Sequence, residues 1–499
     1  MSVESTENKN PDFGGEGALR REVISSVAWV TTTSFAVRAL AAVSSLILAK
    51  LLAPEVFGII AAANVIIAAM EIFSDFGINR ALIQYQGDLR RASNVTLTLR
   101  LTQGVILFII AAASAGEIAY FYQTPALRLI IIVLGFNFII SAAGTVPMTL
   151  LSRDLRFKRQ LLPQAVPAAL QMITAVSMAV AGFGVWSIVA GMVVMNTSKT
   201  ILYWSAAPYK LKLEYDSVVT KHLFSFGLPL FGAGLVLYCQ FHLDKMLVGK
   251  LLGMEQLGYY SFAFIIINLP STEIIYLLNR VMFPAYSLIG RQRRELRSAY
   301  LKSLKYIMLI IAPLSIAIPI MGGNLFHALY HSKWDSAIAP LQAFGVFAFM
   351  RALSAIFGNL FLAIGKTRFL FIISVITLII KAAFIYPSIM TWGITGAAGL
   401  YSVAWTAQII ISVIYLKKWI GAGFVEICER LKYPLLASCV SILPIKYLDG
   451  KLIDLNHPLT LIISVIFIII LYSVLMMKFD KETNISVKES WKKRRLVLI

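Results

Sequence analysis

The sequence predicts an all-α integral membrane protein with fourteen transmembrane helices, in two pseudo-symmetric six-helix lobes followed by two C-terminal helices. Apolar residues make up 59% of the chain and charged residues 14%, against roughly 25% charged residues in soluble domains. The mean hydropathy is +0.78. Long apolar segments recur along the whole chain, and one helical hairpin is repeated 200 residues later. These observations outweigh the soluble multidomain organisation that length alone suggests.

A helix needs about 20 mainly apolar residues to cross a bilayer, and fourteen segments meet this requirement. The segments are 24–48, 57–77, 93–115, 126–147, 163–182, 184–206, 224–248, 257–279, 302–322, 337–361, 367–388, 395–415, 433–448 and 458–477. Only a GFGVW sequence separates the fifth segment from the sixth, and the thirteenth is short. The first has no clear cleavage site, so we expect an uncleaved helix and no signal peptide.

The formal net charge of +20 is distributed unevenly between the two sides of the predicted bundle. With the amino terminus inside the cell, the inner loops hold Arg90-Arg91, the SRDLRFKR run at 152–159, Arg291 to Arg297, Lys417-Lys418 and the basic tail. The outer turns hold little beyond Lys50, Lys250, Lys333 and Lys451. This asymmetry follows the positive-inside rule and predicts that both termini are cytoplasmic. The basic residues form no continuous surface, so nucleic-acid binding is not expected.

Residues 46–58 (LILAKLLAPEVFG) and 246–258 (MLVGKLLGMEQLG) repeat one pattern, with Lys50 on Lys250 and Gly58 on Gly258. Such repeats indicate duplicated halves, which are typical of transporters with a substrate path between the halves. Six helices per half give both halves the same orientation, related by a pseudo-twofold axis along the membrane normal. We expect a cytoplasmic tail (1–23), an N-terminal lobe (24–206), a cytoplasmic linker (207–223), a C-terminal lobe (224–415), a connector with two helices (416–477) and a basic cytoplasmic tail (478–499).

Four cations are predicted deep within apolar helices: Arg38, Arg100, Arg351 and Lys381. An ionisable side chain at mid-bilayer costs about 2.5–3.5 kcal/mol on insertion scales and usually faces a cavity or a partner. We therefore predict that these four line a water-filled, electropositive cavity that binds an anionic substrate. The alternative is structural, with each cation paired to an acid or extended toward an interface. That alternative is favoured for Lys199, which lies nearer a helix end.

The acidic residues of the apolar segments lie mostly toward helix ends and are candidates for gating or structural ion pairs. The candidates are Glu71, Asp244 and Glu273, together with Lys245. Adjacent residues on a helix point about 100° apart, so Asp244 is expected to pair with a residue other than Lys245. A pairing across the lobe interface is one option.

No cofactor, metal site or disulfide is expected from the sequence. Cys239, Cys428 and Cys439 are scattered without CxxC spacing, and the five histidines show no ligand spacing within one helix. No phosphate-binding GxxxxGK[ST] motif is present, which argues against direct ATP drive.

Three stretches resemble the polysaccharide transporter family, the Wzx-type flippases of the multidrug/oligosaccharidyl-lipid/polysaccharide exporter superfamily. RALAAVSSLILAKLLAPEVFGIIAAANVI is similar to the family's first helical hairpin. FGLPLFGAGLVLYCQFHLDKMLVGKLLGMEQLGYYSFAF is similar to its seventh and eighth helices. RDLRFKRQLLP followed by GFGVWSIVAG resembles its middle segment. The resemblance covers about residues 20–480, and its pattern includes Asp244 and Lys245 but assigns no role to the four deep cations.

The resemblance implies two six-helix lobes packed in a V and a non-enzymatic transport activity. The implied cargo is an oligosaccharide linked to undecaprenyl pyrophosphate, such as an exopolysaccharide, capsule or O-antigen repeat unit. The implied location is the bacterial cytoplasmic (inner) membrane. The partners are then the cargo, the lipid bilayer, and a polysaccharide polymerase and glycosyltransferases of the same pathway. A pyrophosphate also carries the charge that a cationic cavity would hold.

Two other function classes are less consistent with the residues. A cation-coupled multidrug exporter on the same scaffold would favour deep acidic residues, whereas the deep charges here are positive. A membrane enzyme acting on lipid-linked glycans would need catalytic groups gathered on one face. The longest outer loop, near 323–336, holds His327, His331 and Asp335 in what reads as a small solvated turn.

Overall fold

Helices form nearly all of the described chain, because apolar segments of this length satisfy their backbone hydrogen bonds internally. The computed structural model describes residues 15–75, 78–154, 156–207, 209–290 and 292–479. The first half forms α1 (Gly15–Leu51), α2 (Pro54–Asp75), α3 (Ile78–Gln84), α4 (Leu89–Phe121), α5 (Ala126–Arg153), the 3₁₀ turn η1 (Phe157–Gln160), α6 (Leu161–Val180) and α7 (Val185–Ala206).

The second half forms α8 (Ser217–Ile289), α9 (Arg293–Tyr330), the 3₁₀ turn η2 (His331–Ala337), α10 (Ile338–Ala343), α11 (Gly345–Ala363), α12 (Thr367–Ile420), α13 (Phe424–Leu448) and α14 (Pro458–Phe479). Within the described ranges the only β-type pairing outside helices is one bridge between Asp449 and Ile453. The predicted all-α class is therefore confirmed. Ten stretches of the described helix are long and apolar enough to span a membrane.

Two helices, α8 with 73 residues and α12 with 54, are long enough for two crossings, and each bends sharply at a glycine. α8 contains Gly253 at φ 85° and α12 contains Gly393 at φ 59°. Both values lie in the left-handed region that glycine adopts without steric cost. The two glycines fall between predicted segments, at 248–257 and at 388–395, so each long helix consists of two helical arms.

The thirteenth predicted segment, 433–448, is the second part of a longer helix. α13 begins at Phe424 and has 25 residues. The first turns of α13 contain charged residues, so an apolar segment defined from the sequence does not include them. Glu426 in this region is held by Arg297 of α9 at 2.5 Å between Oε1 and Nη2, which fixes the start of α13 beside the start of α9.

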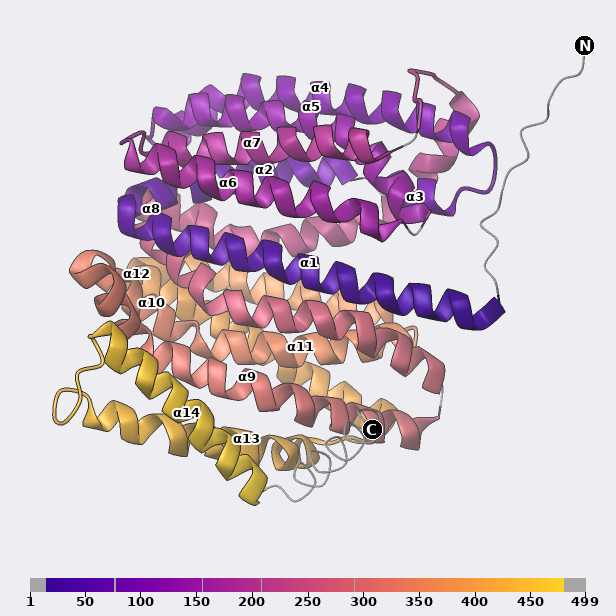
Figure 1. Ribbon diagram of the computed structural model, residues 1–499. Coiled ribbons are helices and arrows are strands. Elements are labelled where there is room, and N and C mark those ends of the chain that lie inside the picture. The colour runs from indigo at the N-terminus through magenta and orange to yellow at the C-terminus, as the bar shows by residue number, and fades with distance from the viewer. Residues whose placement is uncertain (1–14, 76–77, 155, 208, 291, 480–499) are drawn as a thin grey trace, which may run out of the picture.

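The long helices lie side by side and form one bundle, whose two ends are on opposite sides of the view (Figure 1). Helices of the first half (indigo to magenta) occupy the upper part of the view, and α9, α11, α13 and α14 the lower part. We call the end that holds residues 209–216 the linker end. The opposite end, where α1 turns into α2, is the hairpin end. Across the bundle α1 packs on α6, and α2 packs on α8.

Each end has its own apolar core. At the hairpin end Phe57 of α2 packs against Phe262 of α8 and Trp334 of η2, and the Phe262 and Trp334 ring centroids lie 4.1 Å apart. At the linker end Ile78 and Leu82 pack with Val219 and Leu223 near the start of α8. α8 thus contacts the first half of the chain at both ends.

Candidate functional site

A buried ion pair joins α8 to α12 in the second half of the chain. Asp244 is 0% exposed and Lys381 is 3% exposed, and the Lys381 Nζ lies 2.7 Å from Asp244 Oδ1. The other carboxylate oxygen accepts a hydrogen bond from the Tyr260 hydroxyl at 2.5 Å. The sequence assigned Asp244 and Lys381 to different roles, and the structure places them together within the second half.

The Lys381 ammonium has further partners around it. It donates to the Gln240 carbonyl at 2.5 Å and lies 3.7 Å from the centroid of the Tyr401 ring. The Tyr401 hydroxyl donates to the same carbonyl at 3.1 Å. Burial of an ion pair is tolerated when additional hydrogen bonds satisfy both members. Here both members are so satisfied, which favours a role in holding α8 against α12.

Lys245, the neighbour of Asp244, lies against Phe264, whose ring centroid is 5.6 Å from that of Tyr401, the ring that contacts Lys381. Its Nζ lies 4.5 Å from the centroid of the Phe264 ring. No ion pair joins it to Asp244 among the described contacts, as the 100° offset between adjacent helical residues predicts.

Arg351 of α11 is half-buried and contacts neutral groups of α8. Its guanidinium donates to the Asn268 side-chain oxygen and, at 3.1 Å, to the Thr272 hydroxyl. Arg351 is half-buried, whereas Lys381 is 3% exposed. Of these two deep cations of the second half, Arg351 is therefore the more accessible to an anion.

Arg100 of α4 is 7% exposed and holds the end of α2. Its guanidinium donates to the Ser74 carbonyl and, at 3.2 Å, to Gln103. α2 ends one residue later, at Asp75. The last carbonyls of a helix lack partners within the helix and carry partial negative charge, so a cation is stabilising there. This contact gives Arg100 a structural reason to be buried.

The remaining candidates lie apart from these contacts. Arg38 is half-buried on α1, and Glu71 is exposed on α2. The side chain of Glu273 lies outside the described part of the structure. Lys199 of α7, for which the sequence favours a structural role, lines a pocket with Asn196 and Ser141. Its proximity to a helix end had favoured a structural reading.

At the hairpin end the two repeated sequence stretches touch each other reciprocally. A Cβ on Gly58 would lie 1.7 Å from the carbonyl oxygen of Met254, and a Cβ on Gly258 would lie 1.9 Å from that of Pro54. Pro54 and Met254 are equivalent positions of the repeat, and so are Gly58 and Gly258. The same contact is therefore made twice, once in each direction. Only glycine permits such an approach of two helix backbones.

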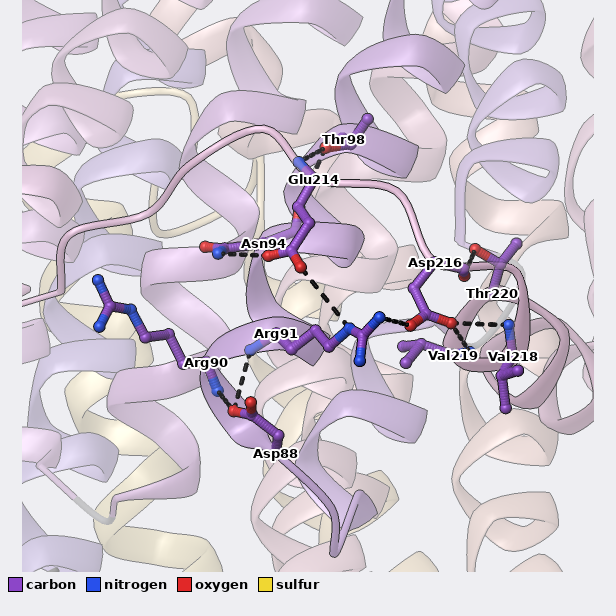
Figure 2. Close-up of polar contacts among 10 residues, drawn as sticks. All are labelled: Asp88, Arg90, Arg91, Asn94, Thr98, Glu214, Asp216, Val218, Val219 and Thr220. Carbon is purple, nitrogen blue, oxygen red and sulfur yellow. Dashed lines mark hydrogen bonds and ion pairs between the residues drawn. The ribbon is translucent and has the colours of Figure 1, made fainter.

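At the linker end a network that we call the linker clamp ties residues 212–216 to the start of α4. Asn94 donates to Glu214 at 3.0 Å and accepts from the Lys212 N–H at 3.0 Å, and the Glu214 N–H donates to the Thr98 hydroxyl at 2.9 Å. Figure 2 shows Arg91 reaching from α4 to Glu214 and Asp216. The segment between the two halves is thereby attached to the first half.

Asp216 ends the linker clamp and begins α8. Its Oδ1 accepts from the Val218 and Val219 N–H groups at 2.8 and 3.1 Å, as a helix N-cap does (Figure 2). Its Oδ2 lies 2.5 Å from Arg91 Nη2. The Val219 and Val218 N–H groups and the Arg91 guanidinium all favour the carboxylate, and they lower the pKa of Asp216 below its usual value.

Two solved membrane transporters share this fold. The lipid II flippase MurJ, in an inward closed conformation, matches with a TM-score of 0.75 at 14% identity, over 92% of this chain and 99% of that chain. An inward-facing multidrug resistance MATE transporter matches with a TM-score of 0.64 at 16% identity, over 77% of this chain and 95% of the other.

Curated relatives match at the level of sequence. The teichuronic acid biosynthesis protein TuaB of Bacillus subtilis is 27% identical over 72% of this chain and 73% of its own length. The lipopolysaccharide biosynthesis protein WzxC of Escherichia coli is 23% identical over 84% of this chain and 86% of its own length. A model of the polysaccharide biosynthesis protein family matches residues 47–339, more than half of the chain. The chain therefore belongs to the polysaccharide biosynthesis protein family.

Proposed function

We propose that this protein is a flippase that moves an undecaprenyl-pyrophosphate-linked oligosaccharide across the bacterial cytoplasmic membrane. Family membership together with a flippase-like fold over 92% of the chain is the observation that carries the proposal. The activity is transport and not catalysis. The cargo would be a repeat unit of a surface polysaccharide, supplied by glycosyltransferases and consumed by a polymerase.

The proposed architecture is fourteen crossings in two six-helix lobes (24–206 and 224–415), plus two further helices, with both termini cytoplasmic. The reciprocal contact of Gly58 and Gly258 supports a pseudo-twofold axis between the lobes at the hairpin end. Contact of the lobes at that end fits a transporter closed there. Alternating access would open this end after cargo has entered from the linker end.

The proposed cargo contacts are Arg38 and Arg351, the two half-exposed members of the four predicted cations. Arg100 and Lys381 are proposed to hold α2 and α8 in place through the contacts described above. A charge-assisted contact to phosphate is worth roughly 1.5–3 kcal/mol. Arg38→Ala and Arg351→Ala should each lower export about ten- to a hundredfold while membrane abundance stays unchanged. Lysine at either position should retain part of the activity, and full export by the double alanine variant contradicts this assignment.

Deletion of the gene from its own organism tests the function itself. The expected result is loss of one surface polysaccharide and accumulation of its lipid-linked precursor on the cytoplasmic side, both restored by a plasmid copy. Leaflet distribution is measured by digestion of intact and permeabilised cells with a membrane-impermeant glycosidase. An unchanged distribution of every lipid-linked glycan contradicts the proposal.

A further inference from the structure

A small pocket lies between α5 and α7, apart from the cations that the sequence singled out. It encloses about 50 Å³ and is lined by Ser141, Gly144, Thr145, Met148, Asn196, Lys199, Thr200 and Tyr203. Two hydrogen bonds brace its walls: Thr200 Oγ1 donates to the Ile140 carbonyl and Trp204 Nε1 to the Ala143 carbonyl, both at 2.9 Å. The pocket is therefore fixed by the packing of the two helices.

Lys199 is the charged group of this pocket, and its situation differs from that of Lys381. Lys199 is half-buried, and no ion pair or hydrogen bond within the described part of the chain involves its ammonium. α7 continues for seven residues to Ala206, which places Lys199 about 10 Å from the end of the helix at 1.5 Å per residue. An ammonium at that depth is costly without a partner and commonly marks a path or a site for an anion.

The rest of the lining, as far as the structure describes it, contains no carboxylate. The Thr145 and Thr200 hydroxyls donate to the backbone carbonyls of Ser141 and Ile140. The Asn196 amide and the Ser141 hydroxyl have no hydrogen-bond partner among the described residues, so both are available to a ligand. An ammonium with neutral donors around it selects an anion with several acceptor oxygens.

The size of the pocket limits that anion. Since about 10–15 Å³ of such space holds one water, the pocket takes a group about the size of a few waters. A phosphate group fits this description, and because Ser141 is exposed, the rest of a larger ligand can extend out of the pocket.

We propose that the α5–α7 pocket binds a single phosphate group, with Lys199 as its cationic contact and Asn196 and Ser141 as donors. The inference rests on the proposed function only for the source of the phosphate. A polyprenyl phosphate would bring it as part of the cargo or its carrier. An anionic phospholipid would bring it from the surrounding leaflet, and inorganic phosphate would supply it from the aqueous phase.

The test uses the full chain in nanodiscs of phosphatidylcholine with three radiolabelled probes: inorganic phosphate, polyprenyl phosphate and phosphatidylglycerol. Lys199→Ala removes the cation. Asn196→Asp keeps the cation but places a carboxylate in the pocket. Ser198→Ala is the matched control, because the Ser198 hydroxyl donates only to carbonyls of its own helix, Val194 and Met195. Lys199→Arg tests whether charge alone suffices, and thermal unfolding verifies that each variant is folded.

The expected result is a ten- to hundredfold loss of affinity in Lys199→Ala and Asn196→Asp, with Ser198→Ala unchanged and Lys199→Arg within a few-fold of the parent. The probe whose affinity falls identifies the source of the phosphate. Unchanged affinity for all three probes in either folded variant overturns the proposal. Because the assay contains no oligosaccharide and measures no export, its failure is distinguishable from failure of the proposed function.

Discussion

Asp244 and Lys381 lie 137 residues apart in the sequence and form an ion pair that is almost completely buried. Each was visible in the sequence as a charge inside an apolar helix. Their pairing was not, because it depends on how α8 and α12 rotate against each other. Arg100 was likewise identified by its depth, whereas its contact with the end of α2 needed the three-dimensional arrangement. Lys199 was assigned a structural role because it lies near a helix end. The sequence of one helix does not show whether an acidic residue of another helix lies beside this lysine, and none pairs with it in the described part of the structure.

Removal of one member of the Asp244–Lys381 pair should destabilise the protein more than removal of both. Lys381→Met leaves a buried carboxylate without its cation, which costs about 3–5 kcal/mol, whereas replacing a whole buried pair is often close to neutral. Thermal unfolding in detergent should show a lower midpoint for Lys381→Met and for Asp244→Ala, with substantial recovery in Asp244→Asn/Lys381→Met. A double variant no more stable than the singles would contradict a mainly structural pair. The export activity of the double variant Asp244→Asn/Lys381→Met then shows whether Lys381 also contacts the cargo.

Asp216 should make the stability of the linker clamp depend on pH in the acidic range. Its pKa is lowered in the folded protein by the Val219 and Val218 N–H groups and by Arg91. A carboxyl with a lowered folded pKa contributes stability above its unfolded pKa of about 3.9, and that contribution is lost as the pH falls through the folded value. Asp216→Asn should therefore unfold more easily than the parent at pH 7, and the difference should shrink toward pH 3.

Arg90→Gln provides the matched control for this pH dependence. Arg90 lies beside Arg91, and its side chain is outside the network drawn in Figure 2. Its substitution should leave the pH profile unchanged. A difference between Asp216→Asn and the parent that persists undiminished at pH 3 would mean that the carboxylate charge is not the cause.

At the scale of helices, the positions of the apolar segments and the internal repeat could be predicted from the sequence. The breaks that contain Gly253 and Gly393 were predicted from short polar or small-residue interruptions, and the repeat was read from Lys50 and Lys250. The charged start of α13 was missed, because apolar content marks the membrane-spanning part of a helix and not its full length. The contact between Gly58 and Gly258 was also beyond reach, since a repeat shows equivalence and not proximity.

Substitution of either glycine at this crossing should prevent closure of the hairpin end. An alanine Cβ at position 58 or 258 would stand 1.7 or 1.9 Å from a backbone carbonyl oxygen, so α2 and α8 must move apart. Gly58→Ala and Gly258→Ala should abolish export, and a cysteine at Leu51 should react faster with an impermeant thiol reagent in these backgrounds. Gly116→Ala is the control, because a Cβ on this helical glycine of α4 meets open space. Normal export in both variants would show that the crossing does not close during transport.

For the whole molecule, the two ends of the bundle differ in charge, and this difference determines the expected orientation in the membrane. Arg91, Arg153 and Arg297 lie at the linker end, where they contact linker or helix-end groups. The loop at 449–457 lies at the opposite end in Figure 1. Basic residues are retained on the cytoplasmic side of bacterial membrane proteins. The linker end should therefore face the cytoplasm and the hairpin end the outside.

Cysteine labelling in whole cells tests this orientation. In a background with Cys239, Cys428 and Cys439 replaced by serine, cysteines are placed at Leu452, which is 79% exposed, and at Lys212, which is exposed in the linker. An impermeant maleimide should label the Leu452 position in intact cells and the Lys212 position only after permeabilisation. The reverse pattern would invert the bundle. Labelling of both positions from outside would mean an even number of crossings between Lys212 and Leu452, where the fourteen-helix arrangement has seven. Because an odd number of crossings must separate positions on opposite sides of the membrane, this pair tests the direction of the bundle and the parity of the crossings between Lys212 and Leu452.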